Sequence, residues 1–397
     1  MLDDFGQRIR DIILSEMDLS RELSDEEICD LIGSVVSREA RDRPMTIKDR
    51  AELERTIFNS LRKLDVLQEL VDDRDVTEIM VNGPNDIFYE KAGRIQRFKG
   101  HFSSEEKLED VIQQIVGRHN RVVNQASPIV DTRLSDGSRV NIVLNPISIG
   151  GSAVSIRKFP EHPMSMERLV EIEALSSEVA RLLQILTQAK YNIFISGGTG
   201  SGKTTFLNAL SQYIPDDERI ITIEDSAELQ LLGAKNIVRL ETRNANTDGV
   251  TPITIRDLIR TALRMRPDRI IVGECRGAEA LDMLQAMNTG HDGSLSTGHA
   301  NSPHDIISRI ETMVLQGQDF PLNAIRQQIA SGIDIIVQLG RLRDKSRRVL
   351  EISEVDGFMD GEIVLHTLYR FEETAVLDSG RTVSYTHLRA HETGAYL

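Results

Sequence analysis

The stretch of the chain that decides its fold is Gly197-Gly198-Thr199-Gly200-Ser201-Gly202-Lys203-Thr204, which Thr205 follows. It satisfies the pattern G-x-x-x-x-G-K-[S/T] at every fixed position. An apolar segment at residues 193–195 runs into it, and a segment with apolar residues at 206, 207 and 210 runs out of it. A strand, a glycine-rich turn and a helix in this order predict a phosphate-binding loop, or P-loop.

The residue types of this stretch suit a nucleoside triphosphate with Mg²⁺. Glycines let the backbone wrap the phosphates and direct N–H groups at them, and the start of the following helix adds its positive dipole end. Lys203 should neutralise phosphate charge, and the hydroxyl of Thr204 should bind Mg²⁺. The chain has no Asn-Lys-x-Asp motif for reading guanine, so we expect residues 197–205 to bind ATP.

Two further apolar segments end in acids. One is Ile270-Ile271-Val272-Gly273-Glu274, and the other is Ile221-Thr222-Ile223-Glu224, with Glu228 shortly after it. Acids at the carboxyl ends of parallel strands lie where ligands bind. We predict that Glu274 orients the attacking water or holds the metal, and that Glu224 and Glu228 bind Mg²⁺ through water. The sequence leaves open which of Glu274 and Glu224 is the base, and a solvated strand end without a ligand is the alternative for Glu224.

A loop rich in small residues runs from His291 to His299. Two histidines without a third ligand do not predict a metal site. Small residues let the backbone approach a ligand, so either histidine could reach the γ-phosphate or sense its loss. A purely structural loop is an equal alternative on these residues alone.

The segments outside this region predict an α/β protein with several parts. Residues 1–70 read as a helical extension, with a capping box at Ser24 and Glu27 and apolar residues on one face of each helix. Residues 71–158 alternate short strands with a helix that Ser103 is predicted to open, and Ser135-Asp136-Gly137-Ser138 predicts a hairpin turn. Core packing is the favoured role of the first helices, and docking of a regulatory partner is the alternative.

The later segments complete this division. Residues 159–168 contain two prolines and predict a linker. In residues 169–383 strands alternate with helices, which predicts a parallel sheet with helices on both faces. Residues 384–397 have no apolar period and resemble translated adapter sequence, so we leave them out of the fold as a non-native tail.

Composition limits the partners of the chain. It has 397 residues and a net charge of −15, which weighs against nucleic acid as a partner. No apolar run reaches the roughly 18 residues that span a bilayer, and the first residues lack the pattern of a signal peptide. Cys29 and Cys275 form no disulfide framework. We expect a cytoplasmic protein that reaches a membrane only through a partner.

The four motifs together resemble the type II/type IV secretion ATPase superfamily, which carries a Walker A loop, an acidic box, a Walker B strand and a histidine box in this order. Within it, Val76-Thr77-Glu78-Ile79-Met80-Val81-Asn82-Gly83-Pro84 is similar to the Tad-pilus branch, the CpaF family. The resemblance implies a RecA-like P-loop ATPase domain behind a mixed α/β domain. It also implies a homo-hexamer that works with inner-membrane platform proteins in pilus assembly or protein secretion.

The resemblance also assigns roles to residues. Arg139 and Arg157 match arginines that act on the phosphates from the first domain, and Arg133 is a weaker match. His291 and His299 match the histidine box and would sense the γ-phosphate. A surface ion pair is the alternative for each arginine. The chain departs from its branch at the C-terminus, where the foreign-looking tail stands, and it lacks the zinc-binding cysteines of some type II members.

Two other functions fit a P-loop. A RecA-like nucleic-acid motor would need basic, aromatic-laced segments, and the charge of −15 with 4% aromatic residues speaks against it. A nucleotide-gated assembly module without useful turnover would be favoured if Lys203 or Glu274 were missing, and both are present. The foreign-looking C-terminal tail is the best support for this alternative.

Overall fold

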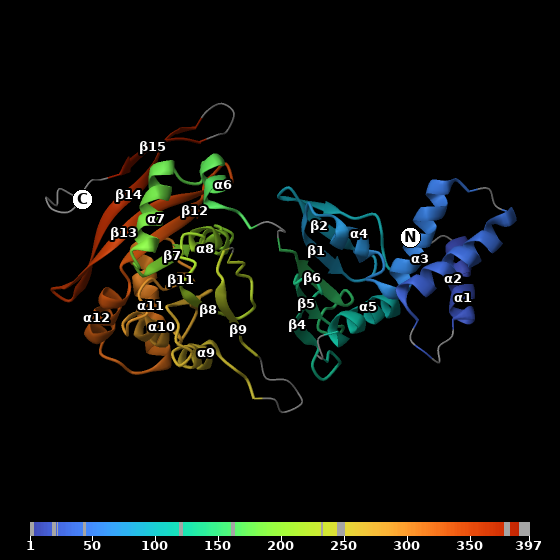
Figure 1. Cartoon of the computed structure of the whole chain (residues 1–397), viewed down its shortest axis with the longest axis horizontal. Helices are drawn as coiled ribbons and strands as arrows, with labels where there is room; N and C mark the ends of the chain where they lie inside the picture. Colours follow the sequence, from blue (N-terminus) through green and yellow to red (C-terminus); the bar gives the residue numbers. More distant parts are fainter. Residues whose placement is uncertain are drawn as a thin grey trace. The chain divides into compact units, whose positions relative to one another are not determined.

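The computed structural model of the chain describes residues 4–17, 21, 23–42, 45–118, 122–159, 163–231, 233–243, 251–376 and 382–388. It divides into two compact units, Met1–Glu161 and His162–Leu397 (Figure 1). The division lies within the stretch predicted as a linker. Helix α6 (Met166–Glu171) begins inside that stretch, because the hydroxyl of Ser165 accepts the backbone N–H of Arg168 and caps the helix.

The first unit opens with helices that pack on a core of their own. Ser24 and Glu27 form the predicted capping box, and isoleucine and valine side chains of the helices are buried together. Leu64 follows the last of these helices and packs in the core of the neighbouring sheet. The helices are α1 (Asp4–Glu16), α2 (Asp25–Glu39), the 3-10 turn η1 (Ala40–Asp42) and α3 (Ile47–Arg62).

The rest of the first unit is a six-stranded antiparallel sheet with two helices, as an alternation of short strands with a helix predicts. The predicted hairpin is present, with Asp136 and Gly137 in its turn. The strand order is β3-β2-β1-β6-β5-β4. The elements are α4 (Leu67–Asp72), β1 (Val76–Asn82), β2 (Ile87–Lys91), β3 (Arg94–Arg97), α5 (Glu105–Gly117), β4 (Ile129–Arg133), β5 (Arg139–Val143) and β6 (Ala153–Arg157).

One helix start in this unit corrects its prediction. Ser104, not Ser103, caps α5, because its hydroxyl accepts the backbone N–H of Lys107 at 3.2 Å. The two serines are adjacent, and only the backbone conformation decides which of them can reach the third helical N–H group.

The second unit is built on a nine-stranded sheet in the order β15-β14-β13-β12-β7-β11-β10-β8-β9. Strands β7 to β12 pair in parallel, as predicted. The sheet as a whole is mixed, because β13, β14 and β15 extend it by antiparallel pairing. The strands are β7 (Ile193–Gly197), β8 (Arg219–Glu224), β9 (Asn236–Glu241), β10 (Arg269–Val272), β11 (Leu295–Gly298), β12 (Ile335–Arg341), β13 (Arg347–Met359), β14 (Glu362–Val376) and β15 (Thr382–Leu388).

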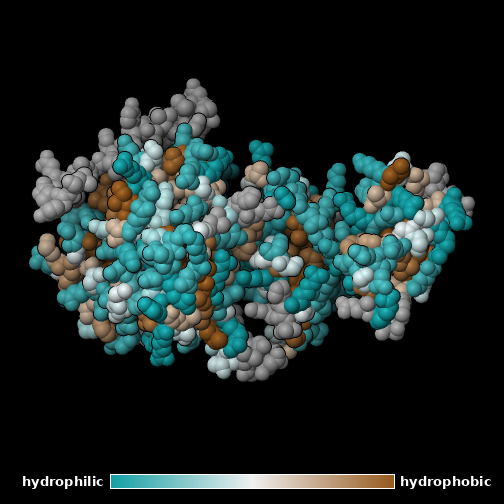
Figure 2. Space-filling model, viewed as in Figure 1, coloured by the Kyte–Doolittle hydropathy of each residue, from teal (hydrophilic) through white to brown (hydrophobic). Residues whose placement is uncertain are grey.

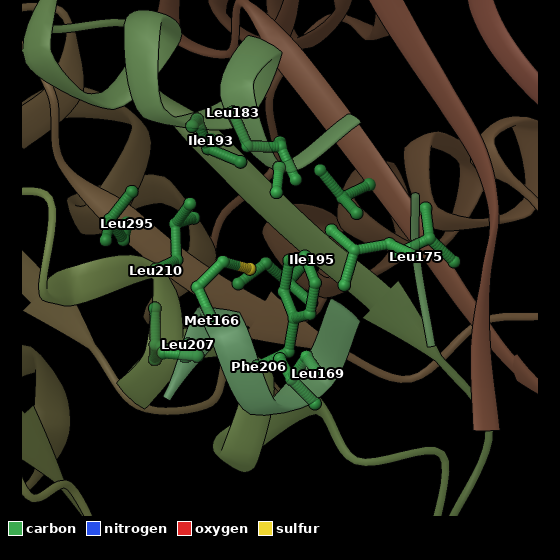
Figure 3. Close-up of a cluster of buried hydrophobic side chains, with 14 of the residues drawn as sticks. Met166, Leu169, Leu175, Leu183, Ile193, Ile195, Phe206, Leu207, Leu210 and Leu295 are labelled. Atoms are coloured by element: carbon green, nitrogen blue, oxygen red, sulfur yellow. The ribbon is translucent and has the colours of Figure 1, made fainter. Parts of the chain in front are cut away.

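Helices cover both faces of this sheet, because successive strand side chains point to opposite sides. Ile193 and Ile195 of β7 pack in one core with α6 to α8, and Phe194 packs in the other with α9 to α12 (Figure 1). Figure 3 shows the first core, with Leu183 from α7 and Phe206 from α8. The helices are α7 (Ser177–Gln188), α8 (Lys203–Ser211), α9 (Ile255–Ala262), α10 (Ala280–Met287), α11 (Pro303–Gly317) and α12 (Leu322–Gly332).

The C-terminal stretch predicted as a foreign tail is partly described. Residues 384–388 belong to β15, which pairs with β14, and residues 389–397 lie outside the described part. Its predicted origin stays a prediction.

The surface seen in Figure 2 is mostly hydrophilic, with apolar residues in small patches. Within the described ranges, every helix is too short or too polar to cross a bilayer. The two cysteines differ in access: Cys29 on α2 is exposed, whereas Cys275 is 1% exposed. Burial raises the pKa of the Cys275 thiol well above its ordinary value.

Candidate active site

Four of the predicted motifs meet at one edge of the nine-stranded sheet. The P-loop follows β7, Glu224 ends β8, Glu274 follows β10 and His299 follows β11. These strands are parallel neighbours, so their carboxyl ends lie together. The fold thereby gathers side chains that are far apart in the sequence.

The P-loop has the backbone of a phosphate cradle. Gly200 and Gly202 have φ values of 71° and 94°, a region that residues with a Cβ rarely adopt. A Cβ on Gly197 would lie 2.7 Å from the carbonyl oxygen of Leu339, so the strand end tolerates only glycine. Helix α8 starts at Lys203 without a side-chain cap, so its first N–H groups are donors for an anion.

The donor set also fits Mg²⁺. Thr204 lies in the first turn of α8, where its hydroxyl can bind the ion beside the phosphates. Mg²⁺ keeps several waters and takes few protein ligands, so one hydroxyl with water-mediated carboxylates is a sufficient set. Within the described residues, no three His, Cys, Asp or Glu side chains form a group that could hold a metal by themselves.

A line of close polar contacts joins the P-loop to the acid that follows β10. Lys203 Nζ lies 3.2 Å from His299 Nδ1, and His299 Nε2 lies 2.8 Å from Glu274 Oε1. The ammonium can only donate, so Nδ1 accepts and the proton of a neutral ring is on Nε2. Nε2 lies close to Glu274 Oε1 without the geometry of a hydrogen bond. Lys203 also donates to the carbonyl oxygens of Gly197 and Gly198 at 3.0 and 3.2 Å.

Electrostatics favour neutral His299. Burial lowers its pKa first, and the charge of Lys203 lowers it further. Burial likewise lowers the pKa of Lys203, which nearby Glu274 partly offsets. The arrangement is therefore a cation, a neutral imidazole and a carboxylate in one line.

Arg276 is a functional candidate that the sequence reading missed. Its Nη2 donates to Glu274 Oε2 at 2.6 Å, and its Nη1 lies 3.6 Å from Asp225 Oδ2. It thus connects the acids that end β10 and β8. A basic residue two positions after the strand-end acid was the available signal, but arginines are common at such positions and carry little information alone.

Glu224 holds the loop that follows it. It is 4% exposed, and its Oε1 accepts the backbone N–H groups of Glu228 and Leu229 at 2.8 and 3.0 Å. Its Cγ lies 2.8 Å from where a Cβ on Gly273 would stand. One carboxylate oxygen of Glu224 is thus engaged with backbone, whereas Glu274 contacts the side chains of Arg276 and His299. The choice between the two acids as the base stays a prediction. The metal contacts predicted for Glu224 and Glu228 stay predictions.

The structure does not bring His291 to this site, which corrects its predicted nucleotide contact. His291 precedes β11 and contacts the carbonyl oxygen of Ala286 at 3.2 Å, whereas His299 follows β11. Parallel strands place their amino ends at the edge opposite the P-loop. The sequence spacing could not show that the four-residue strand β11 separates the two histidines.

The three predicted arginines belong to the first unit and are neighbours there. Arg139 of β5 stands opposite Arg133 of β4 and opposite Arg157 of β6 in the strand register. The sheet therefore gathers positive charge at one end of three adjacent strands. Their predicted action on a nucleotide in the second unit stays a prediction.

A parallel sheet with a P-loop after β7 and an acid after β10 defines a RecA-like P-loop nucleotide-binding protein. Residues 60–385 match the family described as Type II/IV secretion system protein, so the chain belongs to that family.

The chain is also similar to named proteins of conjugal transfer and type IV secretion. The chain is 31% identical over 332 residues to the conjugal transfer protein TrbB of Rhizobium radiobacter, covering 82% of this chain and 98% of the relative. It is 33% identical over 321 residues to the type IV secretion system protein PtlH homolog of Bordetella bronchiseptica, covering 74% and 94%. The fold is similar to the crystal structure of the pilus retraction motor PilT with bound ADP, with a TM-score of 0.55, 23% identity, and coverage of 77% and 82%.

Proposed function

We propose that the protein hydrolyses ATP with Mg²⁺ and uses the energy as a motor of a secretion or pilus machine. The observation that carries the proposal is the line of close polar contacts from Lys203 through His299 to Glu274, at the edge where the P-loop lies. This line connects Lys203, which would bind the phosphates, to Glu274, which would act on the attacking water.

Each residue has a role in this proposal. The P-loop amides and Lys203 bind the phosphates, and Thr204 holds Mg²⁺, which supplies charge neutralisation when bound. Glu274 orients and polarises the attacking water. His299 responds to the phosphates through Lys203. Its Nδ1 accepts a hydrogen bond from this lysine, and bound phosphates attract the same ammonium group. Arg276 holds the second oxygen of Glu274 in place.

The machine that we propose is a Tad pilus or a type IV secretion system. The similarity of residues 76–84 to the Tad branch supports the first, and the relatives named for conjugal transfer and type IV secretion support the second. In either case we infer a homo-hexamer in the cytoplasm that meets inner-membrane platform proteins.

The test is ATP hydrolysis by the full chain after size fractionation. Glu274→Gln should lower kcat by roughly 10² to 10⁴-fold while nucleotide binding is retained, since it removes the acid that acts on water. Glu224→Gln should cost less, because an amide oxygen can still accept the loop N–H groups. Lys203→Ala should lose binding as well.

The control is Lys235→Ala, which removes an exposed lysine of the same unit. Activity in a hexamer-sized peak that both Glu274→Gln and Lys203→Ala abolish supports the motor. A wild-type chain that binds ATP without turnover, as a monomer, would instead favour a nucleotide-gated assembly module.

A further inference from the structure

The turn between β12 and β13 lies beside the P-loop. Strand β12 pairs in parallel with β7 as far as Leu339, which stands opposite Gly197, so it accompanies β7 to the start of the loop. The turn is closed by a hydrogen bond from Leu342 N–H to the carbonyl oxygen of Ser346 at 2.8 Å. Asp344 Oδ1 braces it by accepting from the N–H and hydroxyl of Ser346. Strand β13 then begins at Arg347.

Arg347 touches the P-loop backbone directly. Its Nε donates to the carbonyl oxygen of Gly200 at 2.8 Å, although the two residues are 147 positions apart. Its Cδ lies 3.4 Å from where a Cβ on Gly202 would stand, so its aliphatic stem follows the loop. Within the described chain, no other hydrogen bond or ion pair of this exposed side chain is present.

This contact acts on the shape of the loop. A P-loop binds phosphate when its N–H groups point inward, and this requires outward carbonyls. In a trans peptide the C=O and the following N–H point in opposite directions. Arg347 holds the Gly200 carbonyl, and the N–H of the same peptide, that of Ser201, therefore faces away from Arg347, where it donates to the carbonyl oxygen of Gly198 at 3.3 Å. Lys203 binds the carbonyls of Gly197 and Gly198.

We propose that Arg347 is a positioning residue for nucleotide binding, which holds the P-loop in its phosphate-receiving shape and places a guanidinium beside it. The proposal deepens the proposed nucleotide site and rests on it. The competing explanation is that any positive charge near the site favours nucleotide binding, because the turn also exposes Arg341, Arg343 and Lys345. Arg343 carries the same charge in the same turn without touching the loop, so Arg343→Ala is the matched control.

The first experiment measures ADP affinity by calorimetry on the full chain at fixed salt and Mg²⁺. Arg347→Ala should weaken ADP binding about tenfold, the effect of losing one charge-assisted hydrogen bond. Arg343→Ala should change it by less than about twofold. Arg347→Lys should recover only part of the loss, since it keeps the charge without the planar Nε–H donor. Equal weakening in Arg347→Ala and Arg343→Ala, or no change in either, overturns the proposal.

The second experiment measures hydrogen exchange of residues 198–204 in the absence of nucleotide. Exchange should be faster in Arg347→Ala than in Arg343→Ala, while exchange in β13 and the melting temperature stay equal. In hydrolysis, Arg347→Ala should raise KM for ATP with kcat nearly unchanged.

These readouts separate the two proposals. If the wild type binds ADP but does not hydrolyse ATP, the motor proposal fails and the affinity comparison still decides the role of Arg347. If the wild type does not bind ADP, the motor proposal fails, and equal loop exchange in the two variants would overturn the positioning role as well.

Discussion

His299 shows at the scale of one residue how the site depends on a protonation state. Its two ring nitrogens face opposite charges: Nδ1 accepts from Lys203, and Nε2 lies 2.8 Å from Glu274 Oε1. A protonated ring would donate from both nitrogens and would face the ammonium with a like charge. The hydrogen bond from Lys203 to His299 therefore exists only while the imidazole is neutral.

We expect the hydrolysis rate to fall at acid pH for this reason. Burial and Lys203 lower the pKa of His299 below its ordinary value of 6.5, so the inhibitory protonation occurs below that pH. The same shift makes the unfolded state bind more protons as pH falls through 6.5, so folding stability also declines from there. The measurement is kcat/KM from pH 5 to 8 for the wild type and His299→Asn. If the fall in kcat/KM at acid pH persists unchanged in the variant, the protonation of another group causes it.

Single residues also show which parts of the site could not be predicted from the sequence. The P-loop motif predicted Lys203 and Thr204, and the acid after an apolar segment predicted Glu274, because both signals are local in the sequence. Arg347 escaped notice, since its contact joins positions 147 residues apart and a lone arginine has no pattern. His291 was placed at the site because the sequence shows two histidines in one loop and hides the strand between them.

At the scale of elements, hydrophobic period and turn residues predicted much of the fold. The capping box at Ser24 and the hairpin around Gly137 are local chemistry and form as predicted. The antiparallel strands β13 to β15 were not foreseen as an extension of the parallel sheet, because which edge a strand joins is a long-range choice.

The cap of α5 gives a test at this scale. Ser104→Ala should destabilise the start of α5 by about 1 kcal/mol, because the N–H of Lys107 loses its acceptor. Ser103→Ala is the matched control and should be nearly neutral. Hydrogen exchange of the first turn of α5 checks both, and a larger effect at Ser103 would restore the sequence-based choice of cap.

At the scale of the whole molecule, a buried ion pair joins distant segments of the second unit. Arg269 is fully buried and binds both carboxylate oxygens of Glu218, which precedes β8. Its Nη1 also donates to the carbonyl oxygens of Thr187 in α7 and Gly293 before β11, at 2.8 and 3.1 Å. One side chain thus joins its own strand, β10, to three other parts of the chain at the edge opposite the P-loop.

Breaking that pair should be costly. Arg269→Met should destabilise the second unit by about 3–5 kcal/mol, since it leaves a nearly buried carboxylate with only the more exposed Lys190, at 3.7 Å, as a cationic partner. The double variant Arg269→Met with Glu218→Leu should be more stable than the single one. Exchange of β10 amides in urea reports on this unit, and the exposed Arg264→Met serves as control. A double variant less stable than the single one would contradict the argument.

The arginines of the first unit lead to a prediction about the assembly. If Arg139 and Arg157 act on a nucleotide held by a neighbouring subunit, subunits with Arg157→Ala and subunits with Lys203→Ala should be inactive alone. Mixed together, they should regain a fraction of the activity, because some sites then combine an intact arginine with an intact P-loop. A mixture as inactive as its parts would place the arginine in its own subunit or outside the reaction.

The unequal exposure of the two cysteines has a practical consequence. Maleimides attack thiolates that they can reach, and Cys275 is both enclosed and hard to ionise. Cys29 lies open on α2. The natural chain therefore offers a single attachment point for a dye or spin label, on its helical extension, without any substitution. A probe placed there would report whether that extension senses the nucleotide bound in the other unit.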